Sequence, residues 1–171
     1  LSSELSKHFE DFLPIPYLNV IADTYYLEKN SNFIFFIDKI KEVKNNYFSK
    51  YSNHKFLNNF SENEIMIIGS ILEKEGLEKV DKQKISSVIF NRLKQNMKLQ
   101  IDATVVYAIT NGSYDLDRKL LLSDLKIKHP YNTYLNYGLP PKPISYVGRK
   151  TLDLLFENYQ SDFLFYFFNK S

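Results

Sequence analysis

Cysteine and tryptophan are both absent from this sequence of 171 residues. Without cysteine, the chain can form neither disulfide bonds nor thiolate metal sites. The three histidines, His8, His54 and His129, lack the spacing of zinc ligands. The sequence also has no phosphate-binding loop, dinucleotide fingerprint or nucleophile elbow. We therefore expect neither a metal ion nor an organic cofactor.

Long apolar runs are absent as well, because no stretch approaches the roughly 18 residues that a membrane-spanning helix needs. The sequence shows no signal peptide, and it begins at Leu1 rather than at Met. We expect a fragment from which a targeting segment has been removed, so that any contact with a membrane involves a segment outside this chain.

Charge of one sign is not in excess either, since 22 Lys and Arg residues face 20 Asp and Glu residues. Nucleic-acid binding usually requires a concentrated basic surface, and no such run is present, so we predict no nucleic-acid partner. The composition, 44% hydrophobic and 25% charged, is typical of a globular protein. We expect one domain over residues 1–171, with an N-terminal helical and strand part at 1–60 and a core at 61–171.

The residue pattern predicts an α+β fold in which helices pack on a small, mainly antiparallel sheet. Ser61 and Glu64 form a capping-box pattern, and Gly76 is a plausible helix end. Helical spacing predicts helices at 33–43, 61–75, 82–95, 104–109 and 148–157, with a further helix early in residues 1–60. Apolar or alternating runs predict strands near 20–27, 98–102 and 163–168. Four of the six prolines lie at 129–143, which predicts a shaped loop.

Glu75 is the leading candidate for acid–base chemistry. At about 100° per residue, Ile65, Ile68, Leu72 and Glu75 share one face of the predicted helix. A carboxyl group on an apolar face loses hydration, which raises its pKa toward the range that a general acid needs. The alternative is a carboxylate at the helix end that reaches solvent or pairs with a core arginine.

Three further groups could bind a polar ligand, and each has a plainer interpretation. Arg92 falls on the apolar face of its helix, where it either pairs with a carboxylate or extends its stem past the core. Gln100 and Asp102 share one face of the predicted strand, which is either a binding surface or an exposed edge. Tyr131, Asn132 and Tyr134, with Thr133 between them, could offer rings and hydrogen bonds to a sugar. These loop residues could equally form a rigid surface loop with tyrosine packed beneath it.

Six sequence blocks occur in an order that matches a known family. They are Ile71-Leu72-Glu73-Lys74-Glu75, Val88-Ile89-Phe90-Asn91-Arg92-Leu93, Met97-Lys98-Leu99-Gln100-Ile101-Asp102, Thr104-Val105-Val106-Tyr107, Pro130-Tyr131-Asn132-Thr133-Tyr134, and Gly138-Leu139-Pro140-Pro141 with Pro143-Ile144. Together they resemble the endolytic murein transglycosylases of the YceG-like family, over roughly 61–148. A fainter resemblance covers Asp23-Thr24-Tyr25 and Phe163 to Phe168.

The resemblance implies that Glu75, the second Glu of the Glu-Lys-Glu motif, is the catalytic residue. It implies cleavage of peptidoglycan glycan strands with formation of 1,6-anhydro-muramic ends, and a lyase that works in cell wall synthesis and remodelling. We assign Gln100, Asp102, Tyr131, Asn132, Tyr134 and Arg92 to substrate binding or to orienting Glu75. No cofactor is implied.

The resemblance also implies a single-pass inner-membrane protein whose catalytic domain faces the periplasm, and peptidoglycan synthases as possible partners. The family's membrane helix and LysM-like domain precede the catalytic part and are absent from this chain. The chain differs from the family pattern at Asp81-Lys82, where an acidic residue and Arg are usual. It also has Ala22 and Ala103 in place of Pro, and Lys142 in place of Gly. It stops at Ser171, before a His-containing hairpin.

Two other functions remain open from the sequence. One is a peptidoglycan hydrolase with Glu75 as the acid and Asp102 or Asp81 as the base. The other is a non-catalytic glycan-binding module, which the Asp81-Lys82 departure and the early C-terminus leave open.

Overall fold

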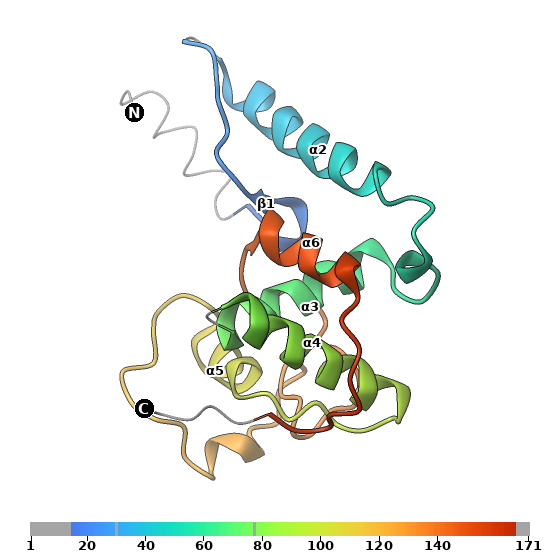
Figure 1. The fold of residues 1–171 in the computed structure, drawn as a ribbon. Helices are drawn as coiled ribbons and strands as arrows, with labels where there is room; N and C mark the ends of the chain where they lie inside the picture. Colours follow the sequence, from blue (N-terminus) through green and yellow to red (C-terminus); the bar gives the residue numbers. More distant parts are fainter. Residues whose placement is uncertain (1–14, 30, 77, 167–171) are drawn as a thin grey trace.

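The computed structural model describes residues 15–29, 31–76 and 78–166, and within them the chain is mainly helical (Figure 1). The helices are α2 (Phe33–Ser49), α3 (Glu62–Glu75), α4 (Lys79–Lys94), α5 (Asp102–Thr110) and α6 (Arg149–Glu157). Short 3-10 turns are η1 (Tyr17–Asn19), η2 (Lys55–Asn58) and η3 (Asp124–Lys126), and the strands are β1 (Ile21–Ala22) and β2 (Val147–Gly148). Among these residues, no helix is long and apolar enough to cross a membrane.

Helix α3 lies at the centre of the fold. Its start is the predicted capping box, in which the Glu64 amide donates to Ser61 and the Glu64 carboxylate accepts from the Ser61 amide at 2.8 Å. All eight residues from Ile65 to Leu72 are buried. A helix buried on every side must be enclosed by other elements, and α3 indeed contacts α4, α5, α6 and β2.

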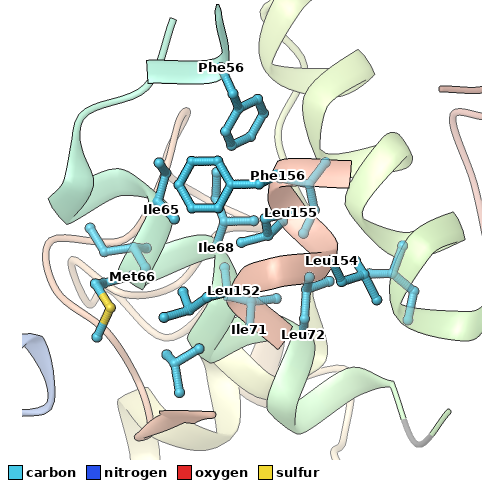
Figure 2. Packing of buried hydrophobic residues seen from close by; sticks show 14 of the residues in the cluster. Phe56, Ile65, Met66, Ile68, Ile71, Leu72, Leu152, Leu154, Leu155 and Phe156 are labelled. Carbon is cyan, nitrogen blue, oxygen red and sulfur yellow. The ribbon is translucent and has the colours of Figure 1, made fainter. Parts of the chain in front are cut away.

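Helix α6 covers α3 with a strongly apolar face. Figure 2 shows Leu152, Leu155 and Phe156 of α6 directed toward apolar side chains of α3 and toward Phe56, while Leu154 lies on the side of α6 that faces α4. The ring of Phe156 also stacks on Tyr51, with centroids 3.8 Å apart. This packing joins the end of the chain to the segment that follows α2.

The sheet differs from the prediction. The fold is helix-rich with a small sheet, as an α+β fold requires, but β1 pairs with β2 in parallel, with Ile21 opposite Val147. The predicted antiparallel sheet is therefore wrong. Two strands that lie this far apart in the sequence can pair in parallel because the intervening chain provides the crossover.

The strand predicted near 98–102 is also wrong. Leu99 and Ile101 are buried and Gln100 is exposed, which produces the alternation that suggested a strand. Gln100 instead adopts a left-handed conformation with φ of 49°, and α5 begins at Asp102. Residues 163–166 of the third predicted strand form no strand, and 167–168 lie outside the described residues.

The helix predictions are confirmed with shifted bounds. Helix α2 runs on to Ser49, α4 begins at Lys79, and α5 spans Asp102–Thr110. The loop at 129–143 contains neither helix nor strand, as predicted. The helix expected early in residues 1–60 falls where residues 1–14 lie outside the described part of the chain.

We predict that Gly69 is required for the close approach of α3 to β2. A Cβ atom at Gly69 would lie 2.6 Å from Cγ1 of the buried Val147. Overpacking of this kind should lower the free energy of unfolding of Gly69→Ala by about 1–3 kcal/mol, measured by urea denaturation. In a Val147→Ala background the added methyl group has room, so the same change should cost clearly less. Equal costs in both backgrounds would contradict the prediction.

Candidate active site

Glu75 is the last residue of α3, and two different groups bind its carboxyl oxygens. The backbone N–H of Ala103 donates to Oε1 at 3.0 Å, and the hydroxyl of Tyr166 donates to Oε2 at 3.0 Å. Ala103 belongs to the first turn of α5, whose N-cap residue Ile101 makes no side-chain capping bond. Glu75 therefore caps α5 from a neighbouring helix and satisfies an amide that would otherwise lack a partner.

Burial raises the pKa of Glu75 above its usual value, and the nearby Asp102 carboxylate raises it further. The hydrogen bonds from Ala103 and Tyr166 act in the opposite direction but do not cancel the effect of burial. The net direction is the one predicted from the apolar face of the helix. A carboxyl group in this state holds a proton closer to neutral pH than an exposed glutamate does.

The neighbouring Glu73 has a different role. Its Oε2 accepts from Nζ of Lys82 at 2.5 Å, and Oε1 accepts from the Gly148 amide at 2.9 Å. Lys82 thus forms an ion pair with Glu73. The sequence left open that Glu75 pairs with a buried cation. In the structure, the glutamate of this motif that forms an ion pair is Glu73.

A pocket of about 540 Å³ opens beside Glu75. Its wall includes Ala103 of α5, and Lys74 lies at its edge. Its aromatic lining comes from four tyrosines, Tyr17, Tyr107, Tyr114 and Tyr146. Tyrosine rings offer apolar faces together with a hydroxyl group, which suits the alternating apolar and polar surface of a sugar.

None of the six predicted binding residues, all within the described ranges, lines this pocket. Tyr131 contacts it indirectly, since its ring packs on that of Tyr107 with centroids 4.6 Å apart. Asp102 and Tyr134 form a pair next to Glu75, in which the Tyr134 hydroxyl donates to the Asp102 carboxylate at 2.5 Å. The structure thus brings Asp102, Tyr134 and Glu75 together, while Gln100 is exposed on the preceding turn.

Asn132 requires a correction, because its side chain has no exposed surface. Its Nδ2 donates to the carbonyls of Leu125 and Ile127 at 3.0 and 2.9 Å, and its Oδ1 accepts from the Tyr134 amide at 2.9 Å. These bonds shape the loop and leave no group for a sugar. We therefore assign Asn132 to loop structure rather than to direct binding.

Thr133 fastens the same loop to the start of α5. Its hydroxyl accepts from the Ile101 amide at 3.0 Å and lies 2.8 Å from the Thr104 hydroxyl. Its carbonyl accepts from the Gln100 amide at 3.1 Å. This buried network fixes the first turn of α5, and so it places the Ala103 amide opposite Glu75.

Arg92 also requires a correction. It is only 6% exposed, and its guanidinium donates to the carbonyls of Leu164 at 2.7 Å and Leu99 at 2.6 Å. The group also lies over the ring of Phe165, 4.8 Å from its centroid. Arg92 therefore neither extends past the core to solvent nor is available to a substrate. Its role is to connect the C-terminal segment to the loop before α5.

Sequence reasoning missed Tyr166 and the pocket tyrosines. Tyr166 lies in a run of aromatic residues that reads as a buried strand, and only the faint family resemblance at 163–168 pointed to it. Tyr17 and Tyr146 meet edge to face, with centroids 4.7 Å apart, although they lie far apart in the sequence. Within the described residues, no group of three or more His, Asp or Glu side chains could hold a metal ion.

A half-buried carboxyl group with a raised pKa on the wall of an aromatic pocket has the properties of a general acid beside a site that suits a sugar. The chain belongs to the YceG-like family, whose model matches residues 17–171. The resemblance seen in the sequence blocks is therefore confirmed.

The chain is 41% identical over 127 residues to the endolytic murein transglycosylase of Bacillus subtilis, covering 74% of this chain and 34% of that protein. It is 29% identical over 146 residues to the protein of that name from Streptococcus pneumoniae, covering 84% and 26%. A crystal structure of a putative yceG-like protein from Listeria monocytogenes matches with a TM-score of 0.73 and 32% identity, covering 89% of this chain and 48% of that chain. This chain thus spans less than half of each of these relatives.

Replacing Glu75 should separate its capping role from its acidity. Glu75→Gln keeps an oxygen that accepts from Ala103, whereas Glu75→Ala leaves that amide without its partner. We expect the free energy of unfolding of Glu75→Ala to fall about 1 kcal/mol below that of Glu75→Gln, measured by urea denaturation. Indistinguishable values would show that α5 does not depend on this cap.

The stability of the protein should also depend on pH through Glu75. Because folding raises the pKa of this carboxyl group, its contribution to stability is present below the unfolded pKa and is lost as pH rises through the folded pKa. Glu75→Gln has no proton to lose, so its free energy of unfolding relative to the parent should rise as the pH increases from the unfolded pKa through the higher folded pKa. Denaturation at a series of pH values tests this, and a difference that falls with pH would contradict it.

Proposed function

We propose that this chain is the catalytic part of an endolytic lytic transglycosylase that cuts the glycan strands of peptidoglycan. The single observation that carries the proposal is the Glu75 carboxyl group, half-buried at the edge of an aromatic pocket and with a raised pKa. Support also comes from family membership and from the two relatives named as endolytic murein transglycosylases.

Glu75 acts first as an acid. Its proton passes to the glycosidic oxygen between N-acetylmuramic acid and N-acetylglucosamine, and the bond from that oxygen to the anomeric carbon breaks. Burial supports this step, because a carboxyl group with a raised pKa is protonated more often near neutral pH. The N-acetyl group of the substrate stabilises the positive anomeric carbon, as in other substrate-assisted enzymes.

Glu75 then acts as a base. Its carboxylate takes the proton of the C6 hydroxyl of the muramic residue, and the C6 oxygen bonds to the anomeric carbon. The product carries a 1,6-anhydro ring, no water is consumed, and Glu75 is protonated again. One carboxyl group therefore suffices where most glycoside hydrolases need two.

A hydrolase is the second candidate, because Asp102 lies close enough to Glu75 to raise its pKa. In that case Asp102 would activate water as the base. Glu75 lines the pocket, whereas Asp102 does not line it and is bonded to the Tyr134 hydroxyl. Since a base that activates water has to reach the sugar, this placement supports the transglycosylase. The products separate the two functions, because hydrolysis leaves reducing ends and transglycosylation leaves anhydro ends.

The cellular setting belongs to the same proposal. A catalytic domain that acts on peptidoglycan works on the outer side of the cytoplasmic membrane, and we propose a single membrane anchor in a segment outside this chain. The periplasm and inner membrane are the corresponding compartments in a bacterium with two membranes. Peptidoglycan synthases are the proposed partners, since strands must be cut where they are made.

Glu75→Gln should abolish formation of anhydro ends while the fold persists. The amide keeps the shape and the bond to Ala103 but has no acidic proton, so the rate should fall at least about 100-fold. Mass spectrometry of purified glycan strands after incubation measures the anhydro-muramic ends.

Glu42→Gln is the matched control, because Glu42 is exposed on α2 and bonds only surface residues. It should cut strands at the parent rate. Full activity of Glu75→Gln would refute the assignment and leave the glycan-binding module as the better interpretation.

A further inference from the structure

The segment after α6 runs along α4 (Figure 1). Three side chains of α4 hold it. Ser87 Oγ lies 2.6 Å from Ser161 Oγ, and Asn91 Nδ2 donates to the carbonyls of Ser161 and Phe163 at 2.6 and 2.8 Å. Arg92 Nε then donates to the Leu164 carbonyl.

These bonds hold the segment against α4 up to Leu164. Two residues further on, the Tyr166 hydroxyl reaches the Glu75 carboxyl group. Of the three side chains, Arg92 also bonds the Leu99 carbonyl. The segment is therefore fixed relative to both α4 and the loop that leads into α5. The bonds from α4 thus place the Tyr166 hydroxyl within hydrogen-bond distance of Glu75.

The two oxygens of Glu75 differ in what they can do. Oε1 accepts from a backbone amide, which can donate a hydrogen bond but cannot accept one. Oε2 accepts from a phenol hydroxyl, which can both donate and accept. A proton on Oε1 would face the amide donor, whereas a proton on Oε2 leaves Oε1 free to accept from the amide and can itself be donated to the phenol oxygen. Oε2 is therefore the oxygen that can gain and lose the proton with both hydrogen bonds kept.

We propose that Tyr166 is a positioning residue for the reaction, which orients the Glu75 carboxyl group through Oε2 and makes Oε2 the oxygen that exchanges the proton. This inference rests on the proposed function of Glu75. The hydroxyl does not touch the sugar bond in this role. It acts through Glu75, by holding the carboxyl group in one orientation and by stabilising the carboxylate that exists between the two proton transfers.

Other charged and titratable groups lie near Glu75, and their charges also affect its pKa or that of its neighbours. Asp102 of α5 raises its pKa, and Lys74 of α3 faces the same pocket. Tyr134 of the loop and Arg92 of α4 interact electrostatically with this cluster. Burial and Glu75 raise the pKa of Tyr166 itself, so its hydroxyl keeps its proton across the working range. Loss of the Tyr166 hydroxyl should therefore be seen as a change in the pKa of Glu75, the group to which this hydroxyl is bonded.

Tyr166→Phe tests the proposal, since it removes one hydroxyl and keeps the ring. The titration of the Glu75 side-chain carbon by NMR, assigned by comparison with Glu75→Gln, should move to a higher pKa. The rate kcat should fall roughly tenfold, as expected for a lost hydrogen bond to a charged group, while KM stays near the parent value. The alkaline limb of the pH–rate profile should move to higher pH.

Tyr26→Phe is the matched control, because Tyr26 is 87% exposed and does not line the pocket. It should change neither the titration nor the rate. Asn91→Ala loosens the segment without altering Tyr166 and should shift the Glu75 titration in the same direction by a smaller amount.

An unchanged Glu75 titration in Tyr166→Phe overturns the proposal, as does a general loss of activity with no shift of the alkaline limb. The NMR titration needs no turnover. The titration therefore tests the effect of Tyr166 on Glu75 separately from activity. It remains informative even if Glu75→Gln proves active and the proposed function is refuted.

Discussion

The arrangement of the site depends on one half-buried carboxyl group, which lies where three segments of the chain meet. Glu75 ends α3, caps α5 through Ala103 and accepts from Tyr166 of the C-terminal segment. A negative charge is unfavourable at the end of its own helix and favourable at the start of the next. The geometry thus balances burial against two hydrogen bonds, and the net pKa stays raised.

The two glutamates of the Glu-Lys-Glu motif illustrate how position separates chemical roles. Glu73 is neutralised by Lys82 and bonded to the Gly148 amide, so it joins α3 to α4 and β2. Glu75, two residues later, has no such ion pair within the described residues. Lys82 also donates to the Thr151 hydroxyl of α6, so the same cation connects α3, α4 and α6.

The sequence was sufficient for those features that depend on local pattern. The capping box at Ser61 and the apolar face that ends at Glu75 both follow from helical spacing, and the structure has both. The strand near 98–102 failed because Leu99 and Ile101 are buried by a loop that is distant in sequence, which mimics strand alternation. Asn132 and Arg92 were assigned to substrate because nothing local reveals that buried carbonyls would take their donors. Tyr166 escaped notice because its partner lies 91 residues away.

The parallel pair of β1 and β2 is short, yet it determines how one wall of the pocket is built. It holds the segment that contains Tyr17 beside the segment that contains Tyr146, whose hydroxyl donates to the carbonyl of Ile15 at 2.9 Å. The far side of the cavity is therefore assembled from the two ends of the domain rather than from one contiguous stretch. A chain trimmed at its leading end past Tyr17 would keep its acid group but lose part of the surface against which a saccharide rests.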